Sequence, residues 1–138
     1  MAYWLVKSEP SAYAWERLVK EGKAGWDGVR NHQAAANLKA MKVGDRAFFY
    51  HSNEGLAVVG IAEITRTAYP DPSDKGGKFV MVDLKPVVAM KEPVSLAAIK
   101  AEPKLNDIAL VRQSRLSVQP VDAAAWKLIC KMGGVKPE

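Results

Sequence analysis

The sequence predicts an α+β domain built on a curled, mostly mixed β-sheet with short helices beside it. Three observations lead to this prediction: four stretches have the residue pattern of strands, four others have helical periodicity, and several strands follow one another without a helix between them. The last observation argues against a doubly wound parallel sheet, in which helices connect the strands. A chain of 138 residues has the usual length of one domain, and we expect residues 1–138 to form one.

Four stretches rich in β-branched and aromatic residues are expected to be strands, and a shorter fifth is a further candidate. They are residues 3–7, 46–51, 57–65 and 78–86, followed by 116–121. The third stretch ends in alternation around Glu63 and Thr65, which predicts that one of its faces meets solvent. Residues 69–77 combine prolines, which lack an amide donor, with glycines, which tolerate a positive φ, and this predicts an exposed turn between two strands.

Four segments are expected to be helices, namely residues 15–20, 31–41, 95–100 and 122–132. The first stops at Gly22. The other three open at Asn31, Ser95 and Asp122, whose side chains can accept a hydrogen bond from an amide of the first helical turn. The sequence therefore marks the starts of these three helices more sharply than their ends.

The charge of the chain is compatible with a polyanionic partner. Twenty Lys and Arg residues against 15 Asp and Glu residues give a net charge of +5, and the pI is about 9.4. Each phosphate that a protein neutralises releases counterions, so a basic domain is attracted to nucleic acid. A solvated basic surface would explain the same charge. The sequence has no dense Lys/Arg tract, so nucleic-acid binding would need a shaped site in addition to the charge.

The sequence also indicates in which cellular compartment the protein resides. It has no apolar run of the ~20 residues that a membrane span needs. The start MAYWLVKSEP has no basic region followed by an apolar stretch, so no signal peptide is expected. The single cysteine, Cys130, excludes an internal disulfide framework. We therefore expect a cytoplasmic protein, or a nuclear one if the source is eukaryotic.

No residue pattern predicts catalysis, a metal or a cofactor. The two histidines, His32 and His51, have no second histidine or cysteine at the spacing of a zinc site. His51 and Ser52 are neighbours on an expected strand and would point to opposite faces, so they would not pair as base and nucleophile. Residues 25–28 lack the spacing of a phosphate-binding loop, and Cys130 is expected to be a small buried hydrophobe.

One tryptophan is placed differently from the others. Trp4, Trp15 and Trp126 lie in segments expected to pack in the core, whereas Trp26 lies in a glycine-bracketed loop just before an expected helix. An exposed indole face contributes about 1–3 kcal/mol to stacking on a base. The amides that follow Asn31 could receive an anion. Packing in the core is the alternative for Trp26.

Polar residues gather at the ends of two expected strands. Lys7, Ser8 and Glu9 follow the first strand, and Pro10 holds Glu9 extended. In the run that ends with Tyr50, His51 and Ser52, side chains with an apolar body and a hydrogen-bonding tip are suited to reading the edge of a heterocycle. Near the C-terminus, Arg112 and Arg115 flank a strand start and could contact phosphate. Each group could instead be ordinary solvated or structural polar residues.

Together these segments resemble the EVE domain family, which belongs to the PUA-like superfamily and is related in fold to YTH domains. The matching strings are WLVKSEP (4–10), WDGVRN (26–31) with Gln33, MKVGD (41–45), FFYHS (48–52), VVGIAEI (58–64), YPDPS (69–73), LVRQSRLSVQPV (110–121) and MGG (132–134). They span nearly the whole chain in one order. The resemblance implies a single compact domain, a PUA-like pseudobarrel with a strongly curved mixed sheet, flanking short helices and a small pocket at one end.

The resemblance also implies binding without catalysis: a monomeric module that takes a modified base of DNA or RNA, such as a methylated or hydroxymethylated cytosine, into an aromatic-lined pocket. Carried over by motif, the residues expected to bind the base or ligand are Lys7, Ser8, Glu9, Trp26, Asn31, Tyr50, His51, Ser52, Ser114 and Arg115. Many members have Arg-Asn where this chain has Ala35-Ala36, so a phosphate contact is expected to be missing here. His32 replaces a common aromatic.

Two other classes of function fit the same residues. One is a hydrolase or transferase acting on a nucleotide-like small molecule, with His51 or Glu9 as general base and Lys7 as an electrostatic clamp. The other is a protein-interaction domain whose pocket is vestigial. The sequence does not distinguish DNA from RNA or one modified base from another.

Overall fold

The computed structural model describes residues 1–137, and within them six strands form one mixed sheet in the order β2-β5-β4-β3-β1-β6. The strands are β1 (Tyr3–Ser8), β2 (Ala24–Gly25), β3 (Arg46–His51), β4 (Ala57–Pro70), β5 (Val80–Ser95) and β6 (Val118–Val121). The helices are α1 (Trp15–Glu21), α2 (His32–Ala40), α3 (Leu96–Ala101), α4 (Ala109–Arg112) and α5 (Ala123–Gly133), with a short 3₁₀ turn, η1, at Pro103–Leu105. The predicted α+β class and mixed sheet are confirmed.

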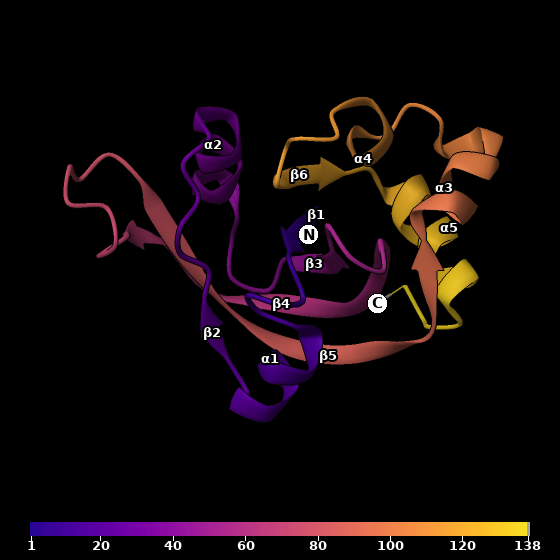
Figure 1. Ribbon diagram of the computed structural model, residues 1–138, viewed down its shortest axis with the longest axis horizontal. Helices are drawn as coiled ribbons and strands as arrows, with labels where there is room; N and C mark the ends of the chain where they lie inside the picture. The colour runs from indigo at the N-terminus through magenta and orange to yellow at the C-terminus, as the bar shows by residue number, and fades with distance from the viewer. Residues whose placement is uncertain (138) are drawn as a thin grey trace.

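The sheet is mixed because β1 runs parallel to β3, whereas the other neighbouring strands in the described residues are antiparallel. The longest strands, β4 and β5, form a curved hairpin whose loop projects at the left of Figure 1. Their pairing shifts register at several points, and such bulges bend and twist a sheet. The sheet therefore curls around its contents instead of remaining flat.

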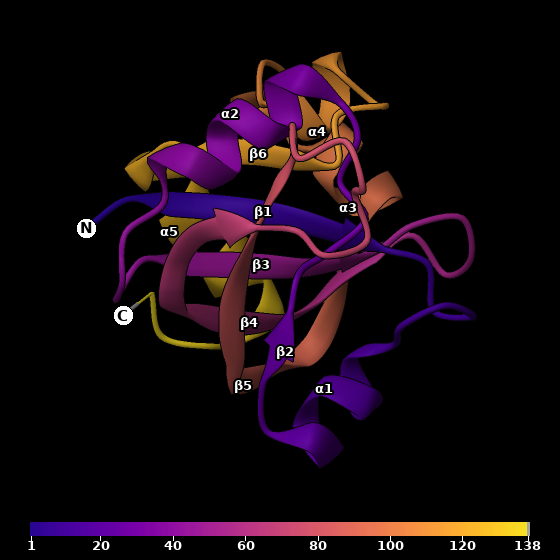
Figure 2. The same ribbon diagram turned by 90° about the vertical axis from the view of Figure 1, so that its left-hand side faces the viewer.

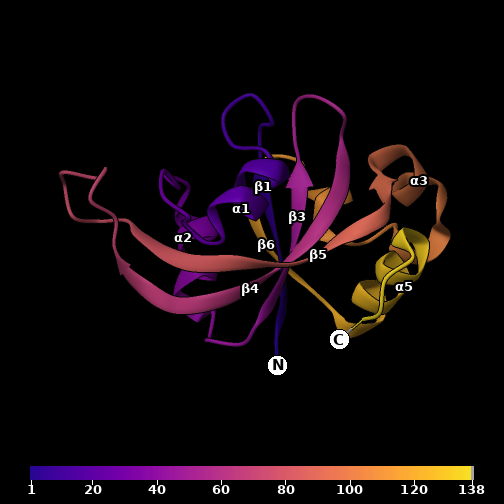
Figure 3. The ribbon, with the colours of Figure 1, turned by 90° about the horizontal axis from the view of Figure 1, so that it is seen from below.

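Helices cover both sides of the curled sheet. Figure 3 shows α1 and α2 on one side of the β1 and β3 ribbons, with α3 and α5 on the other. Figure 2 shows α2 lying across the edge where β6 pairs with β1. No helix in residues 1–137 has the length and apolar character that a membrane crossing requires.

The two sides of the sheet enclose separate hydrophobic clusters, because successive side chains of a strand point to opposite faces. On β3, Phe49 packs in the cluster with helices α1 and α2, which we call the α1/α2 side. Its neighbours Phe48 and Tyr50 pack in the cluster with α5, which we call the α5 side. Along β1 and β3, whether a residue has an odd or an even number (its parity) therefore decides which hydrophobic cluster its side chain joins.

Most predicted boundaries agree with the structure. β3 has the predicted range, and α2, α3 and α5 begin directly after Asn31, Ser95 and Asp122. Each of these three side chains accepts a hydrogen bond from an amide three residues ahead, at 2.8–3.0 Å. The predicted caps are therefore confirmed.

The predictions for β4 and β5 were too short. β4 continues through Pro70, so the predicted turn loses its first two residues, and β5 continues from Pro86 to Ser95. Prolines and charged residues obscure the strand pattern in this part of β5, but its pairing with β4 continues to Ser95. The two-residue β2 and the four-residue α4 have no sequence signal of their own and were missed.

Gly60 on β4 provides a test of the packing on the α1/α2 side. An added Cβ would lie 2.5–2.6 Å from atoms of the Trp15 ring, closer than packed atoms approach one another. We expect Gly60→Ala to lower the free energy of unfolding by about 1–3 kcal/mol, the usual cost of overpacking, measured by urea titration.

The matched control is Gly76→Ala, in the β4–β5 turn, where the added Cβ would meet only an Asp74 oxygen at 3.3 Å. Equal stabilities for the Gly60→Ala variant and the parent protein would contradict the described contact between Trp15 and β4.

Candidate functional site

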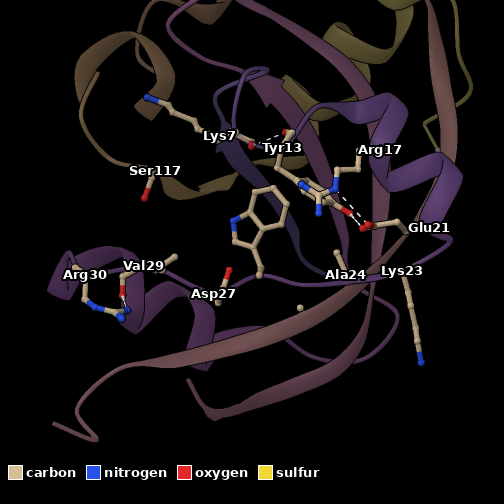
Figure 4. Close-up of a pocket in the computed structure, with 15 residues that line it drawn as sticks. Lys7, Tyr13, Arg17, Glu21, Lys23, Ala24, Asp27, Val29, Arg30 and Ser117 are labelled. Carbon is tan, nitrogen blue, oxygen red and sulfur yellow. Dashed lines mark hydrogen bonds and ion pairs between the residues drawn. The ribbon is translucent and has the colours of Figure 1, made fainter. Parts of the chain in front are cut away.

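A cavity of about 740 Å³ opens beside α1, between the end of β1 and the segment that leads into α2. Its lining residues come from four parts of the chain: Lys7 and Ser8; Ala12, Tyr13, Arg17 and Glu21; residues 23–30; and Ser117. Figure 4 shows Lys7 and Ser117 on one side of the cavity and Tyr13, Arg17 and Glu21 on the other. Segments far apart in sequence therefore converge on one space.

Trp26 forms an aromatic corner of the cavity with Tyr13. The two rings are nearly perpendicular, at 87°, with centroids 6.2 Å apart. Behind Trp26, Phe49 makes a second edge contact at 5.4 Å, and the Trp26 amide donates to the Val82 carbonyl at 2.7 Å. Trp26 is 8% exposed and lines the cavity, so the indole is both a core residue and part of the wall.

Asp71 holds the Trp26 loop, which we define as residues 26–30. One carboxylate oxygen accepts from the Gly28 amide at 2.8 Å and from the Arg30 guanidinium at 3.1 Å, and the other accepts from the Ser73 amide and hydroxyl. Burial disfavours the charged form, but hydrogen bonds from Ser73, Gly28 and Arg30 outweigh it and lower the pKa of Asp71 to about 2. The loop thus depends on a buried carboxylate.

The end of β1 supplies the opposite wall. Ser8 Oγ donates to the Tyr13 carbonyl at 2.6 Å, which ties the segment before α1 to the strand. Lys7 Nζ donates to the Ser114 carbonyl at 2.6 Å and lies 5.9 Å from the Tyr50 ring centroid. Burial lowers the pKa of Lys7. The strand end is thus joined by Ser8 to the segment just after it and by Lys7 to a segment more than 100 residues away.

The rim on α1 is a small network. Glu21 accepts from the Tyr13 hydroxyl at 2.6 Å and from Arg17 Nε at 3.2 Å, and the Arg17 guanidinium lies 4.9 Å from the Tyr13 ring centroid. Burial, together with the hydrogen bond to Glu21, raises the pKa of Tyr13 to about 12. The Tyr13 hydroxyl therefore stays protonated at neutral pH.

A second, smaller hollow of about 360 Å³ lies at the N-terminus of α2. Asn31 and Gln33 line it together with residues 112–116. It adjoins the cavity in sequence at two places, because Arg30 and Ser117 line the cavity whereas Asn31 and Leu116 line the hollow. Arg112 pairs with Asp107 at 3.1 Å. The hollow therefore has two arginines and a helix N-terminus in its lining.

The structure distributes the predicted site residues over three places. Lys7, Ser8 and Trp26 line the cavity. Asn31, Ser114 and Arg115 line the second hollow. The remaining four, Glu9, Tyr50, His51 and Ser52, line neither space.

Tyr50 and His51 lie outside the cavity for different physical reasons. Tyr50 is 3% exposed and packs on the α5 side of the sheet, whereas Trp26 packs on the α1/α2 side. Nε2 of His51 accepts a hydrogen bond at 3.0 Å from the Trp15 amide, which begins α1. Burial lowers the pKa of His51, consistent with an unprotonated acceptor. The expected convergence of these two side chains on Trp26 is not found.

Glu9 and Ser52 contribute backbone hydrogen bonds at the ends of their strands. The Glu9 side chain is exposed, and its carbonyl accepts from the Ala12 and Tyr13 amides, which closes the turn after β1. The Ser52 amide donates to the Ser8 carbonyl at 2.9 Å. The described contacts of both residues support the ends of β1 and β3 and do not reach the cavity.

Sequence reasoning missed several residues that build the cavity. Tyr13, Arg17 and Glu21 form its rim, and Asp71 holds the Trp26 loop from the far end of β4. The YPDPS string contains Asp71, but only the fold brings it to Gly28. Ala35 and Ala36, where an arginine contact was expected to be missing, line neither space, and Ala35 is buried.

The single thiol of the chain lies among the hydrophobic residues of the α5 side and does not line the cavity. Cys130 is buried, and burial raises the pKa of its thiol to about 11, so it is protonated at neutral pH. The part of the chain that the structure describes has no group of three His, Cys, Asp or Glu residues arranged to hold a metal ion. The cavity offers rings, cations and carboxylates for binding.

Comparison with known proteins finds relatives along nearly the whole chain. Residues 2–132 match the EVE domain family. Mouse thymocyte nuclear protein 1 is 36% identical over a 169-residue alignment that covers 98% of this chain and 75% of the mouse protein. An NMR structure from Rhodopseudomonas palustris is 62% identical and covers 97% of this chain and 94% of that one, with a TM-score of 0.92.

A human relative has been crystallised with a ligand. The human THYN1 protein in complex with DNA containing 5-methylcytosine is 32% identical, with a TM-score of 0.91, and the match covers 99% of this chain and all of that one. A YTH domain from Zygosaccharomyces rouxii, 20% identical with a TM-score of 0.61 over 96% of this chain and 86% of that one, shows likeness of fold alone. The expected relation in fold to YTH domains is confirmed.

The role of Asp71 predicts a pH dependence. Its folded pKa of about 2 lies below the usual value near 3.9, so its stabilisation is present above about pH 5 and is lost as the pH falls toward 2. We expect the difference in free energy of unfolding between the parent protein and Asp71→Asn to shrink over this range, measured by urea titration at several pH values.

Comparing the two proteins at each pH cancels the contribution of other carboxylates with lowered pKa values, such as Asp45 and Asp74. A difference that stays constant from pH 5 to pH 2 would show that Asp71 does not hold the loop as a carboxylate.

Proposed function

The chain belongs to the EVE domain family, and on that premise we propose that it is a nucleic-acid-binding module that reads a modified base flipped into the cavity beside Trp26. The observation that carries the proposal is the perpendicular pair of Trp26 and Tyr13 in a cavity of about 740 Å³. Small-molecule pockets have this size and combine aromatic walls with a few polar groups. The 5-methylcytosine DNA bound by the human relative supports the same class of ligand.

The base would contact the exposed part of the Trp26 indole, with the Tyr13 ring perpendicular to it. Taking a base out of a duplex costs a few kcal/mol of stacking and pairing. Stacking contributes about 1–3 kcal/mol per base, and each edge hydrogen bond contributes about 1 kcal/mol. A methyl group adds roughly 0.8 kcal/mol when buried. These magnitudes favour a flipped or single-stranded substrate over an intact duplex.

The nucleic-acid backbone would lie over the second hollow. Arg112 and Arg115 line it, and the N-terminus of α2 adds partial positive charge. Because consecutive residues, 30–31 and 116–117, pass from the lining of the cavity to that of the hollow, a strand with its base beside Trp26 would place a neighbouring phosphate close to these groups. In this arrangement Asn31, Ser114 and Arg115 act on the backbone, while Lys7 and Ser8 shape the cavity.

We propose binding without catalysis, by one domain that acts as a monomer, in the cytoplasm or in a eukaryotic nucleus. The hydrolase or transferase alternative used His51 or Glu9 as general base, but neither lines the cavity, and Nε2 of His51 already accepts a hydrogen bond from the Trp15 amide. Incubation with nucleosides separates the two classes, because saturable thermal stabilisation without turnover supports the reader and turnover supports the enzyme.

Replacing the indole tests the reader directly. We expect Trp26→Ala to bring the affinity ratio between a 5-methylcytosine oligonucleotide and its unmodified counterpart close to one, because the stacking surface is gone. Fluorescence anisotropy with short single strands measures the ratio. An unchanged ratio in a variant that still unfolds cooperatively would remove Trp26 from the mechanism.

Because Trp26 also packs on Phe49, a second measurement keeps the test independent of folding. The indole N–H resonance of Trp26 in the parent protein should shift when the modified oligonucleotide is added. The resonance of Trp126, whose Nε1 donates to the Pro137 carbonyl on the α5 side, is the internal control and should stay in place.

Ionic strength separates nucleic-acid binding from the protein-interaction alternative. Phosphate contacts impose a negative slope on a plot of log affinity against log salt concentration. We expect Arg115→Ala to make this slope shallower for every oligonucleotide, modified or not. A slope of zero in the parent protein would favour the protein-interaction domain.

A further inference from the structure

The two carboxylates that line the cavity, Glu21 and Asp27, differ in their partners. Glu21 accepts hydrogen bonds from Tyr13 and Arg17. The Asp27 side chain is exposed, and no group among residues 1–137 donates a hydrogen bond to its carboxylate or forms an ion pair with it. Asp27 is therefore an acceptor in the lining that the protein itself leaves open.

The backbone around Asp27 is fixed. The Trp26 amide donates to Val82, the Asp27 amide donates to the Gly25 carbonyl at 3.1 Å, and the Gly28 amide donates to Asp71. Gly28 has a φ of +80°, a left-handed conformation that glycine adopts without strain. Figure 4 places Asp27 between Val29 and Ala24 along the cavity wall. The backbone that carries the Asp27 carboxylate is thus held in place directly after Trp26, the residue proposed to contact the base.

We propose that Asp27 is a specificity-determining residue that accepts a hydrogen bond from the exocyclic amine of the bound base, so that the cavity selects amino pyrimidines over oxo pyrimidines. An ionised carboxylate has acceptors only. Cytosine presents an N4 amine to it, whereas thymine and uracil present the O4 acceptor at the same position. This inference rests on the proposed function and adds the chemical class of base.

The charges that line the cavity indicate that Asp27 serves specificity and does not raise the general affinity for nucleic acid. Lys7, Lys23 and Arg30 line the same space, as expected for a site that meets phosphate. A free carboxylate among them repels a polyanion and lowers general affinity. It also disfavours every base that offers an acceptor to it, and such repulsion is one way by which sites gain specificity. Asp27 therefore reduces affinity for the wrong base more than for the right one.

The test compares two oligonucleotides that differ at one base edge. Short single strands with one central 5-methylcytosine or one central thymine have the same 5-methyl group and differ in the 4-amino or 4-oxo substituent. We expect the parent protein to prefer 5-methylcytosine by about tenfold or more, the order that a base-edge contact provides. Asp27→Asn should bring the ratio close to one, because the amide can also donate to O4.

Glu92→Gln is the matched control. Glu92 is exposed on β5 and lies outside the cavity lining, and this substitution raises the net charge by the same amount as Asp27→Asn. Both variants should bind all oligonucleotides somewhat more tightly, but Glu92→Gln should keep the parent's ratio. Thermal unfolding midpoints close to that of the parent would confirm that both variants fold.

The outcomes separate this inference from the proposed function. If Asp27→Asn keeps the parent's ratio, or if the parent binds 5-methylcytosine and thymine equally while still preferring 5-methylcytosine to cytosine, the role of Asp27 is overturned and base reading stands. If the parent does not distinguish 5-methylcytosine from cytosine and its Trp26 resonance does not shift, the proposed function fails.

Discussion

The attachment of the Trp26 loop to the sheet is the constraint on which the cavity depends. Three kinds of contact hold it: the Trp26 amide bonds to β5, the indole packs on Phe49, and the Gly28 amide bonds to the buried Asp71 carboxylate. Because Arg30 and Ser73 also bond to Asp71, one side chain joins the loop before α2 to the turn after β4. The wall is thus built into the folded domain, and a ligand need not order it.

The fold could be predicted from the sequence wherever a local signal and tertiary structure agree. β3 contains an unbroken run of apolar and aromatic residues, 47–50, and the side chains of Asn31, Ser95 and Asp122 begin helices by a local hydrogen bond. The second half of β5 had no such signal, because its prolines and charges are tolerated only through pairing with β4 across several bulges. The length of β5 is set by its pairing with β4, and a local sequence pattern does not predict that pairing.

The site was predicted in part, and different features of the fold keep the other predicted residues out of the cavity. Trp26, Lys7 and Ser8 line the cavity as expected. Tyr50 has suitable chemistry but follows Phe49 on β3, so it faces the other hydrophobic cluster. Excluding Tyr50 from the site requires knowing which side of the sheet holds the cavity. Tyr13 and Asp71 reach the site through a turn and a distant strand, which sequence spacing does not indicate.

The partial burial of Trp26 sets the strength of the proposed interaction. Because Trp26 is only 8% exposed, its indole offers less surface than an open stacking platform, so stacking should lie near the lower end of about 1–3 kcal/mol. Extruding a paired base costs a comparable few kcal/mol. Cavity contacts and extrusion therefore nearly cancel for a duplex, and backbone contacts must supply the remaining affinity. For a base that is already unpaired the cancellation disappears. The same burial that makes the wall rigid thus favours unpaired or weakly paired targets.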